Sequence, residues 1–352
     1  MSEKIKMGIL GLGRAGSGMH IPEIKRNLDK YEITAVCDEI KERADAAAKE
    51  FGCRAYYDID SFLADSSFSF ADIATRSIDH CEHTIKALEA GKNVIIEKPM
   101  ALDIAEAERM YAAADRLNKK LYVRHNRRFE GGFNQALEII DSGILGEVFQ
   151  VVLTRNDFET RNDWQTLSEC GGGQLLNWGP HIVDQALQFG GGYKPESLWY
   201  SLRREEASGN CEDHIKIVFT GENNCIIDME ISSACALKRP DYMLYGDRGT
   251  AALYPDRVEL RYAAPGSEIV KYPSDPGVPG VGGGFGSREG IEWAEPETRE
   301  AKDVFLDQVW GGVYDDFMGI RPYRITREET LKIMELITRV KAGRAQLPPR
   351  TI

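Results

Sequence analysis

The stretch that decides the fold is residues 6–16, with the sequence KMGILGLGRAG. Three of its glycines have the spacing Gly-x-Gly-x-x-Gly and follow a short apolar run. Gly11 would make the tight turn after a strand, Gly13 would let the backbone approach a pyrophosphate, and Gly16 would let the next helix pack closely on the sheet. The phosphates would lie at a helix N-terminus, which favours negative charge. The predicted cofactor-binding residues of this turn are Gly11, Gly13, Arg14, Ala15 and Gly16.

A second apolar run, residues 33–37, ends in Asp38, at the distance from the glycines where a carboxylate accepts hydrogen bonds from the adenosine ribose. Asp38 would repel the 2′-phosphate of NADP, and Glu39 and Ile40 supply no arginine to reverse this repulsion. The nearby cations are Lys41 and Arg43. We therefore expect NAD in preference to NADP.

Up to about residue 123 the sequence alternates between strands and helices, which indicates a parallel sheet with helices on both faces. The expected strands are residues 5–10, 33–37, 54–57, 70–74, 93–96 and 121–123. The expected helices are residues 17–26, 41–51, 79–90 and 103–117, and the first has to accommodate Pro22 by a kink or a late start. The pattern predicts an α/β protein whose residues 1–124 form a doubly wound Rossmann domain.

From about residue 147 the strands become longer and alternate between apolar and polar residues, as in one large, open, mostly antiparallel sheet. The expected strands are 148–156, 198–204, 214–220, 227–231, 243–247 and 258–262, and the expected helices are 133–142, 178–189 and 327–342. A capping box at Thr326 and Glu329 opens the last helix and Gly343 is expected to close it. Residues 125–352 are thus predicted to form an α+β domain for substrate binding and oligomerisation. The glycine- and proline-rich residues 273–290 are expected to be a surface or subunit-contact loop in preference to a lid.

Composition excludes several classes of protein. The chain has 352 residues and a formal net charge of −12, which disfavours nonspecific binding to nucleic acid or an anionic membrane. We find no signal-peptide core and no apolar run long enough to span a bilayer, and we expect a cytoplasmic protein. The seven cysteines form no Cys-x-x-Cys pair, so reduced thiols are expected and no metal site is predicted.

Lys98 directly follows the buried strand 93–96, at the sheet edge where open parallel sheets bind ligands. Pro99 restricts Lys98 to an extended conformation, and a cis bond between the two would fix the direction of the ammonium group. The alternative is an ordinary exposed lysine in a turn.

A second candidate stretch is residues 170–184, with the sequence CGGGQLLNWGPHIVD. Asn177, His181 and Asp184 are spaced four and three residues apart, so on one helix they would project from one face. A histidine is well suited to accept an alcohol proton near neutral pH. Spacing alone leaves two alternatives open: Asn177 as a helix N-cap, and His181 with Asp184 as a structural pair.

These motifs together resemble the Gfo/Idh/MocA family, the oxidoreductases named for glucose-fructose oxidoreductase and inositol dehydrogenase. The resemblance rests on the glycine turn, Glu97-Lys98-Pro99, residues 126–129 (NRRF), and residues 171–184. It implies NAD or NADP at the carboxyl edge of the sheet, and sugar, cyclitol or related polyol substrates. It further implies that Lys98 binds substrate and cofactor, that His181 is the acid/base, and that a homodimer or homotetramer forms through the open sheet face. The remaining residues expected to contact substrate are Asn177, Arg127, Arg128, Trp164 and Asp184, and those expected to contact cofactor are Thr75, His80 and Glu97.

The sequence departs from the family at two places. Asn177 stands where many dehydrogenases of the family have an aspartate, and residues 75–77 (TRS) stand where Thr-Pro-Asn is common. We expect a dehydrogenase or ketose reductase that acts on a secondary alcohol of a sugar-like molecule. Two alternatives stay open: redox-neutral elimination or epimerisation with recycled NAD, and a sensor without catalysis.

Overall fold

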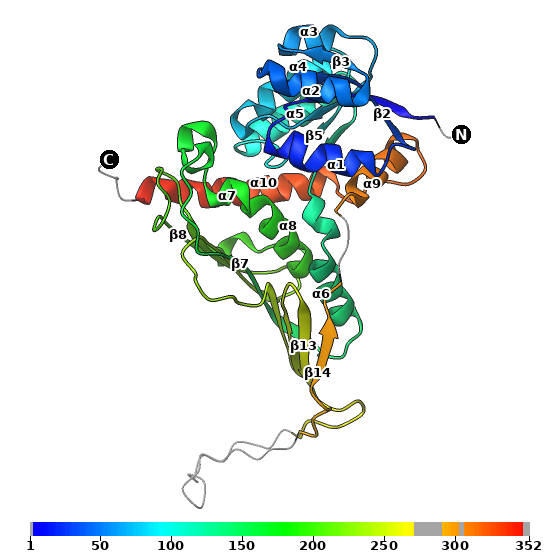
Figure 1. Cartoon of the computed structure of the whole chain (residues 1–352). Coiled ribbons are helices and arrows are strands. Elements are labelled where there is room, and N and C mark those ends of the chain that lie inside the picture. Colours follow the sequence, from blue (N-terminus) through cyan, green and yellow to red (C-terminus); the bar gives the residue numbers. More distant parts are fainter. Residues whose placement is uncertain (1–2, 271–290, 303–305, 348–352) are drawn as a thin grey trace, which may run out of the picture.

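The computed structural model describes residues 3–270, 291–302 and 306–347, so the predicted loop 273–290 lies outside the described residues. One end of the elongated molecule is a parallel sheet with its helices, and the other is a large open sheet (Figure 1). No helix of the described ranges is long and apolar enough to cross a membrane.

The first sheet has six parallel strands in the order β3-β2-β1-β4-β5-β6. They are β1 (Ile5–Leu10), β2 (Tyr31–Cys37), β3 (Arg54–Tyr56), β4 (Phe70–Ile73), β5 (Asn93–Ile96) and β6 (Leu121–Val123). This is the doubly wound order, and the direction of winding reverses between β1 and β4, where such sheets bind nucleotides. The sequence prediction of a Rossmann sheet is therefore confirmed.

Helices cover both faces of this sheet. One apolar cluster joins the sheet to α1 (Ile21–Lys25), α2 (Lys41–Phe51) and α9 (Gln308–Phe317). A second joins it to α3 (Ile59–Ala64), α4 (His80–Glu89) and α5 (Ile104–Arg116). Ahead of α1 the chain forms a π-helical turn, Gly16–His20, which accommodates Pro22 in the first turn of α1.

Helix α9 returns from the end of the chain to the first domain. Its Trp310 is fully buried, and the Tyr31 hydroxyl donates a hydrogen bond of 2.7 Å to the Trp310 carbonyl oxygen. The sequence analysis did not predict α9. The boundary expected at residues 124/125 thus separates the two sheets, although this later helix packs on the first of them.

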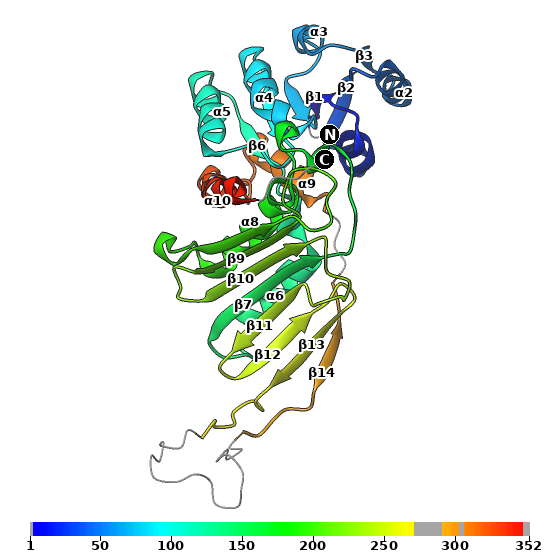
Figure 2. The ribbon, with the colours of Figure 1, turned by 90° about the vertical axis from the view of Figure 1, so that its left-hand side faces the viewer.

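The second sheet has eight strands in the order β14-β13-β12-β11-β7-β10-β9-β8 (Figure 2). They are β7 (Val148–Asn156), β8 (Trp199–Arg203), β9 (His214–Thr220), β10 (Ile226–Ser232), β11 (Tyr242–Gly246), β12 (Gly249–Leu253), β13 (Arg257–Tyr262) and β14 (Glu297–Glu300). Neighbouring strands pair antiparallel except β7 and β10. The mostly antiparallel sheet is as predicted, but β12 and β14 were missed.

The chain covers one face of this sheet with α6 (Gly131–Asp141) and α8 (Gly179–Gly190) (Figure 2). Helix α10 (Arg327–Lys341) packs on α8 and on α5 of the first domain. The capping box of Thr326 and Glu329 is present. Gly343 does not close the helix as expected, because Ala342 holds the C-cap position and Gly343 lies in the following 3₁₀ turn, Ala342–Gln346. A methyl group at Gly343 would approach the Tyr200 ring to 2.7 Å.

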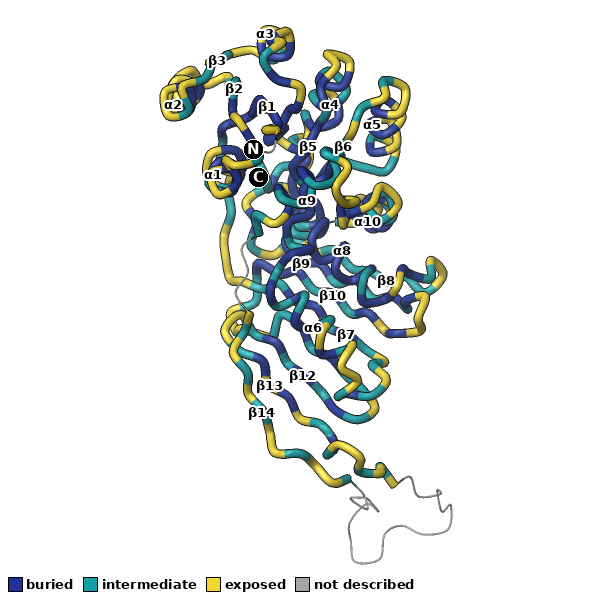
Figure 3. The backbone as a smooth tube through the Cα atoms, turned by 90° about the vertical axis from the view of Figure 1, so that its right-hand side faces the viewer, coloured by how far each residue is buried: buried dark blue, intermediate teal, exposed yellow. Residues whose placement is uncertain are grey.

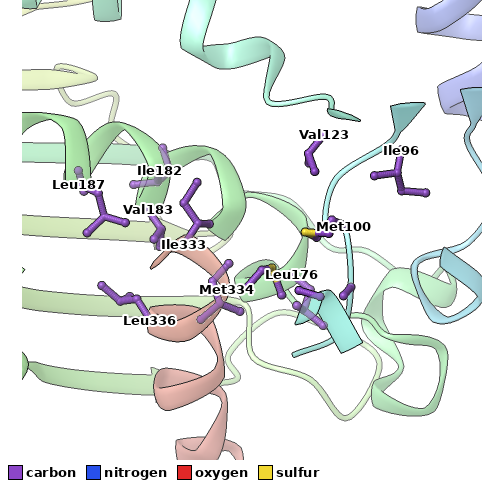
Figure 4. Close-up of a cluster of buried hydrophobic side chains, with 14 of the residues drawn as sticks. Ile96, Met100, Val123, Leu176, Ile182, Val183, Leu187, Ile333, Met334 and Leu336 are labelled. Carbon is purple, nitrogen blue, oxygen red and sulfur yellow. The ribbon is translucent and has the colours of Figure 1, made fainter. Parts of the chain in front are cut away.

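A continuous apolar core joins the two domains. Figure 4 shows side chains from the ends of β5 and β6 beside side chains of α8 and α10. The burial pattern in Figure 3 likewise shows the deepest burial along the strands and at this junction. Since an interior packed this tightly resists deformation, the core fixes the relative position of the first sheet's carboxyl edge and of α8.

Candidate active site at the domain junction

The glycine turn has the geometry that the sequence predicts. Gly11 has a φ of +94°, and a methyl group there would lie 2.7 Å from the Ala74 carbonyl oxygen. At Gly16 a methyl group would lie 2.0 Å from the Gly11 carbonyl oxygen, whereas at Gly13 nothing lies within 4 Å. The turn is closed toward the protein and open at Gly13, so it fits a dinucleotide pyrophosphate that approaches from outside. Arg14 is exposed and Ala15 is half-buried at the same opening.

Asp38 lies at the carboxyl end of β2, beside this turn. Its Oδ2 accepts a hydrogen bond of 2.7 Å from the Leu12 N–H, and its Oδ1 accepts one of 2.9 Å from the Ile40 N–H. The Arg43 guanidinium lies 3.9 Å from Oδ1. The carboxylate is therefore held beside the glycine turn by two backbone N–H groups, and one cation is nearby.

His80 joins the loops that follow β4 and β5. Its Nδ1 lies 2.7 Å from the Pro99 carbonyl oxygen, and its Nε2 lies 3.1 Å from the Thr75 carbonyl oxygen. Burial lowers the pKa of His80 although these two carbonyl groups oppose the shift. His80 thus links two backbone segments through its ring nitrogens. The Thr75 side chain lies next to His83, with 3.1 Å between Thr75 Oγ1 and His83 Nδ1.

Lys98 reaches from the first domain to the second. It follows β5, its bond to Pro99 is cis, and its Nζ donates a hydrogen bond of 3.0 Å to the Asn177 carbonyl oxygen. Burial lowers the pKa of Lys98. The negative charge of Glu97 opposes this shift, and the positive charges of Arg124, Arg127 and Arg14 add to it.

His181 lies in the first turn of α8 and is 6% exposed. Its Nδ1 is buried and has no hydrogen-bond partner among the described residues. Burial and the charges of Lys98 and Arg127 hold its pKa well below the usual range. His181 is therefore neutral at physiological pH and able to accept a proton.

A break between two helices leaves the Asn177 carbonyl free to accept a hydrogen bond from Lys98. Asn177 ends the short helix α7 (Gln174–Asn177), and α8 begins at Gly179. In a continuous helix the Asn177 carbonyl would accept from the His181 N–H, but that N–H donates to the Trp178 carbonyl oxygen at 3.0 Å. The Asn177 carbonyl is therefore left to accept the hydrogen bond from Lys98.

The same break corrects the prediction that Asn177 shares one helix with His181. Asn177 and His181 do not lie on one continuous helix, and Asn177 is not the N-cap, because Trp178 holds that position without a side-chain cap. The Asn177 side chain instead donates to Gln174 Oε1 at 3.3 Å.

Arg128 and Asp184 form a buried ion pair. Arg128 Nε donates to Asp184 Oδ2 at 2.9 Å, Arg128 Nη2 donates to Asp184 Oδ1, and Arg128 Nη1 donates to Glu329 Oε1 of α10 at 3.1 Å. Asp184 is thus paired with Arg128, and the structural pair with His181 is not formed. These bonds join the turn Asn126–Phe129 to α8 and α10 within the second domain, so we leave Arg128 and Asp184 out of the proposed substrate pocket.

Arg127 has a different environment from Arg128. Its Nη1 donates to Glu130 Oε1 at 2.7 Å, and its guanidinium lies 5.1 Å from the centre of the Trp178 ring. The same ring lies edge-on to His181, with 5.7 Å between the ring centres. Trp178 therefore lies next to both Arg127 and His181. It was not among the residues predicted from the sequence, although it lies within the quoted stretch. Trp164, which was expected there, lies in a half-buried 3₁₀ turn, Trp164–Thr166.

Glu97 points into the first domain. Its Oε2 accepts hydrogen bonds from His20 Nε2 and Arg124 Nη1, each at 2.9 Å. A small polar pocket lies on the other side of Asn177. Its lining is Glu159, Arg161, Gln165, Thr166, Gly173, Gln174, Asn177, Ala207, Glu212, Asp213 and Ser233.

Comparison with known proteins identifies the two halves of the chain. Residues 5–125 match a family model described as the oxidoreductase family with an NAD-binding Rossmann fold, and residues 133–252 match the GFO/IDH/MocA C-terminal domain. The chain is 31% identical over 208 residues to scyllo-inositol 2-dehydrogenase (NADP(+)) IolW of Bacillus subtilis. That alignment covers 58% of this chain and 57% of IolW, less than two thirds of the relative.

Solved structures share the whole fold. An NAD-binding protein from Listeria innocua superposes with a TM-score of 0.81 at 24% identity, over 98% of this chain and 96% of that one. The WlbA dehydrogenase from Bordetella pertussis, solved with NADH and UDP-GlcNAcA, superposes with a TM-score of 0.74 at 20% identity, over 98% of this chain and 97% of that one. At these identities the likeness shows a common fold.

Proposed function

Because the chain belongs to the GFO/IDH/MocA family of NAD-binding oxidoreductases, we propose that it interconverts a secondary alcohol and a ketone with a nicotinamide cofactor. The observation that carries the proposal is the meeting of two groups at the domain junction. Lys98 extends from the carboxyl edge of the first sheet to Asn177, and His181, four residues later, has a buried Nδ1 that no described residue hydrogen-bonds. A cation and a neutral base are the two groups that alcohol oxidation requires.

The residues divide the work as follows. The turn at Gly13 would hold the pyrophosphate and Asp38 the adenosine ribose, and a bound nicotinamide would accept the hydride. His181 takes the proton of the substrate hydroxyl, which its neutral state allows. The Lys98 ammonium donates a hydrogen bond to the reacting oxygen and stabilises the negative charge that develops there.

We propose a sugar, cyclitol or related polyol as the substrate. The support is the name of the relative IolW, a scyllo-inositol 2-dehydrogenase, together with a small pocket whose lining includes Asn177, Arg161 and Gln174. Two of its carboxylates are already bound within the protein: Glu212 accepts from Arg344, and Asp213 accepts from the backbone N–H groups of residues 205–207. Arg161 donates to Asp163 and Gln165, and Gln174 Nε2 donates to Ser233 Oγ at 3.0 Å. Substrate hydroxyl groups would therefore replace these bonds.

We propose NAD in preference to NADP, because the Asp38 carboxylate is held beside the glycine turn, where we expect the adenosine ribose to bind. IolW is named for NADP, and Arg43 near Asp38 is a cation that a 2′-phosphate would attract. Steady-state kinetics with both cofactors decide between them, and a higher kcat/KM with NADP would overturn the assignment.

The experiment that tests the function is incubation of the purified protein with NAD and a panel of sugars and polyols at alkaline pH. We expect NADH absorbance to appear with at least one of them. Product without net NADH would indicate redox-neutral recycling, and binding without turnover would indicate a sensor. Either result would overturn the dehydrogenase proposal.

We further propose a homodimer or homotetramer through the face of the large sheet that α6 and α8 leave uncovered. Trp199 and Ile226 are 56% and 43% exposed on strands of this sheet. Light scattering of the purified protein tests the assembly, and a monomer at micromolar concentration would overturn it. We propose the cytoplasm as its location.

A further inference from the structure

A chain of buried hydrogen bonds lies beneath Lys98 and begins at the residue before it. Glu97 Oε2 accepts from His20 Nε2 and from Arg124 Nη1, each at 2.9 Å. His20 and Arg124 are fully buried, and Glu97 is almost so. Oε2 of the Glu97 carboxylate is therefore bound to two side chains in the interior of the first domain.

The chain continues on both sides of Glu97. On one side His20 Nδ1 lies 2.9 Å from Asp72 of β4. On the other, Arg124 Nη2 donates to Glu23 Oε1 of α1, and Trp310 Nε1 of α9 donates to Glu23 Oε2 at 2.8 Å. The set thus ties together β4, the ends of β5 and β6, the helix after the glycine turn, and α9.

The charges in this set do not balance. It contains three carboxylates, Glu23, Asp72 and Glu97, and two cations, Arg124 and His20. Burial lowers the pKa of His20, but the carboxylates around it outweigh burial and raise it to about 9, so His20 is charged at neutral pH. One negative charge is left over, and Lys98, the next residue after Glu97, supplies the matching positive charge.

We propose that Glu97 is a positioning residue for Lys98: the buried anionic set keeps the Lys98 ammonium charged and directed at the Asn177 carbonyl. The role of this arrangement in catalysis rests on the proposed function, whereas the prediction that Lys98 is charged does not. Each side chain of the set makes at least one buried hydrogen bond, although Arg124 Nε has no partner among the described residues. Such a network restricts the movement of Glu97 and so suits the alignment of a single reactive group.

The groups that face Lys98 come from five elements, and Glu97 is the carboxylate that acts most strongly on it. Arg124 after β6, Arg127 in the 3₁₀ turn Asn126–Phe129 and Arg14 in the glycine turn all disfavour its charged form, as burial does. The Asn177 carbonyl accepts its hydrogen bond, and Lys98 in turn lowers the pKa of His181 on α8. Without the Glu97 charge, burial and the three arginines would act on Lys98 unopposed.

The test measures the titration of Lys98 in the full-length, ligand-free protein. Trace labelling with acetic anhydride at a series of pH values, followed by mass spectrometry of the Lys98 peptide, gives the pKa of the amine. We expect Glu97→Gln to lower that pKa by about one unit or more. The matched control is Glu23→Gln, because Glu23 is also buried and also accepts from Arg124, but it is not adjacent to Lys98. We expect the control to leave the titration of Lys98 in place.

The outcomes separate the proposal from a general effect on the fold. An unchanged Lys98 titration in Glu97→Gln, or equal shifts in both variants, would overturn it. If circular dichroism shows that neither variant folds, the wild-type titration decides: a Lys98 pKa near or below about 7 would overturn the proposal and a higher value would support it. Labelling requires no substrate, so it is independent of the proposed activity. If the protein is a dehydrogenase, the alkaline limb of kcat/KM moves to lower pH by the same amount in Glu97→Gln.

Discussion

Two groups of polar residues meet at the domain junction, and they differ in how completely the protein itself satisfies them. Arg128 donates from Nε, Nη1 and Nη2 to Asp184 and Glu329. Within the part of the chain that the structure describes, His181 has a buried Nδ1 with no partner, and Lys98 donates to one backbone carbonyl. Buried groups with all their bonds made stabilise a fold, whereas a buried group with an open position is a candidate for chemistry. We expect this difference to separate structural from reactive residues within one short region.

The largest expected effect is a loss of stability on removal of Arg128, whose guanidinium is hydrogen-bonded to two carboxylates. Arg128→Ala would leave the Asp184 carboxylate buried without its cation, so we expect the free energy of unfolding to fall by about 3–5 kcal/mol. Urea denaturation measures this loss. At a temperature where the variant is folded, kcat/KM should stay within roughly tenfold of the wild-type value.

Arg127→Ala is the matched control, because Arg127 is the neighbouring arginine but faces Trp178 and lowers the pKa of both Lys98 and His181. We expect it to lower kcat/KM more than stability. If Arg128→Ala instead keeps the stability and loses activity a hundredfold, Arg128 binds substrate, as the sequence analysis suggested.

The next largest effect is a loss of activity on removal of His181, whose Nδ1, without a partner among the described residues, can accept a proton. His181→Ala should lower kcat/KM for alcohol oxidation about a thousandfold, the contribution typical of a general base. Since burial holds the pKa of His181 well below the usual range, the wild-type acidic limb should lie below pH 6.5. A pH series of kcat/KM should show that the variant lacks this limb. Retention of both limb and rate would remove His181 from the mechanism.

Lys98→Ala should lower kcat/KM by about a hundredfold, on the order of 3 kcal/mol of transition-state stabilisation. The affinity for NAD, measured without substrate, should change much less, because the glycine turn and Asp38 are untouched. Titration calorimetry and kinetics together separate the two quantities. Equal losses in both would assign Lys98 to the cofactor alone.

The features of the fold and the site that could be predicted depend on residues close together in the sequence. The glycine turn, the apolar strands of the first sheet and the position of Lys98 depend on residues close together in the sequence, and the structure has the predicted elements there. Strand β14 was missed because its residues, Glu297–Glu300, carry no apolar alternation at the edge of the sheet. Helix α9 was missed because its burial depends on strands some 300 residues earlier.

Pairing at the site could not be predicted from spacing. Arg128 binds Asp184 across 56 residues, and nothing in either motif shows that the two side chains use up each other's hydrogen bonds. The spacing of Asn177 and His181 suggested one helix face, but Pro180 lies at the start of a new helix. The backbone carbonyl that this break releases is the contact that Lys98 uses.

A smaller effect tests the buried set beneath Lys98. The folded pKa of His20 is raised from 6.5 to about 9. Its contribution to stability is therefore complete below pH 6.5 and is lost as the pH rises through 9. We expect the free energy of unfolding to fall by up to about 3 kcal/mol across this window. Denaturation at a series of pH values checks it. His20→Gln should flatten the dependence, whereas His214→Gln, in the large sheet, should leave it; a flat wild-type profile would contradict a charged His20.

The smallest expected effect is at Asn177. On one continuous helix a carboxylate at this position would face His181 and raise its pKa by about one unit. The structure turns the Asn177 side chain toward Gln174 and gives its carbonyl to Lys98. We therefore expect Asn177→Asp to move the acidic limb of kcat/KM by less than about half a unit. Asn177→Ala, which keeps the carbonyl, should retain the contact with Lys98 and most of the rate. A shift of the acidic limb by a full pH unit in Asn177→Asp would mean that this side chain turns to His181 during catalysis. Asn177 would then belong, with His181 and Lys98, to the residues that take part in the reaction.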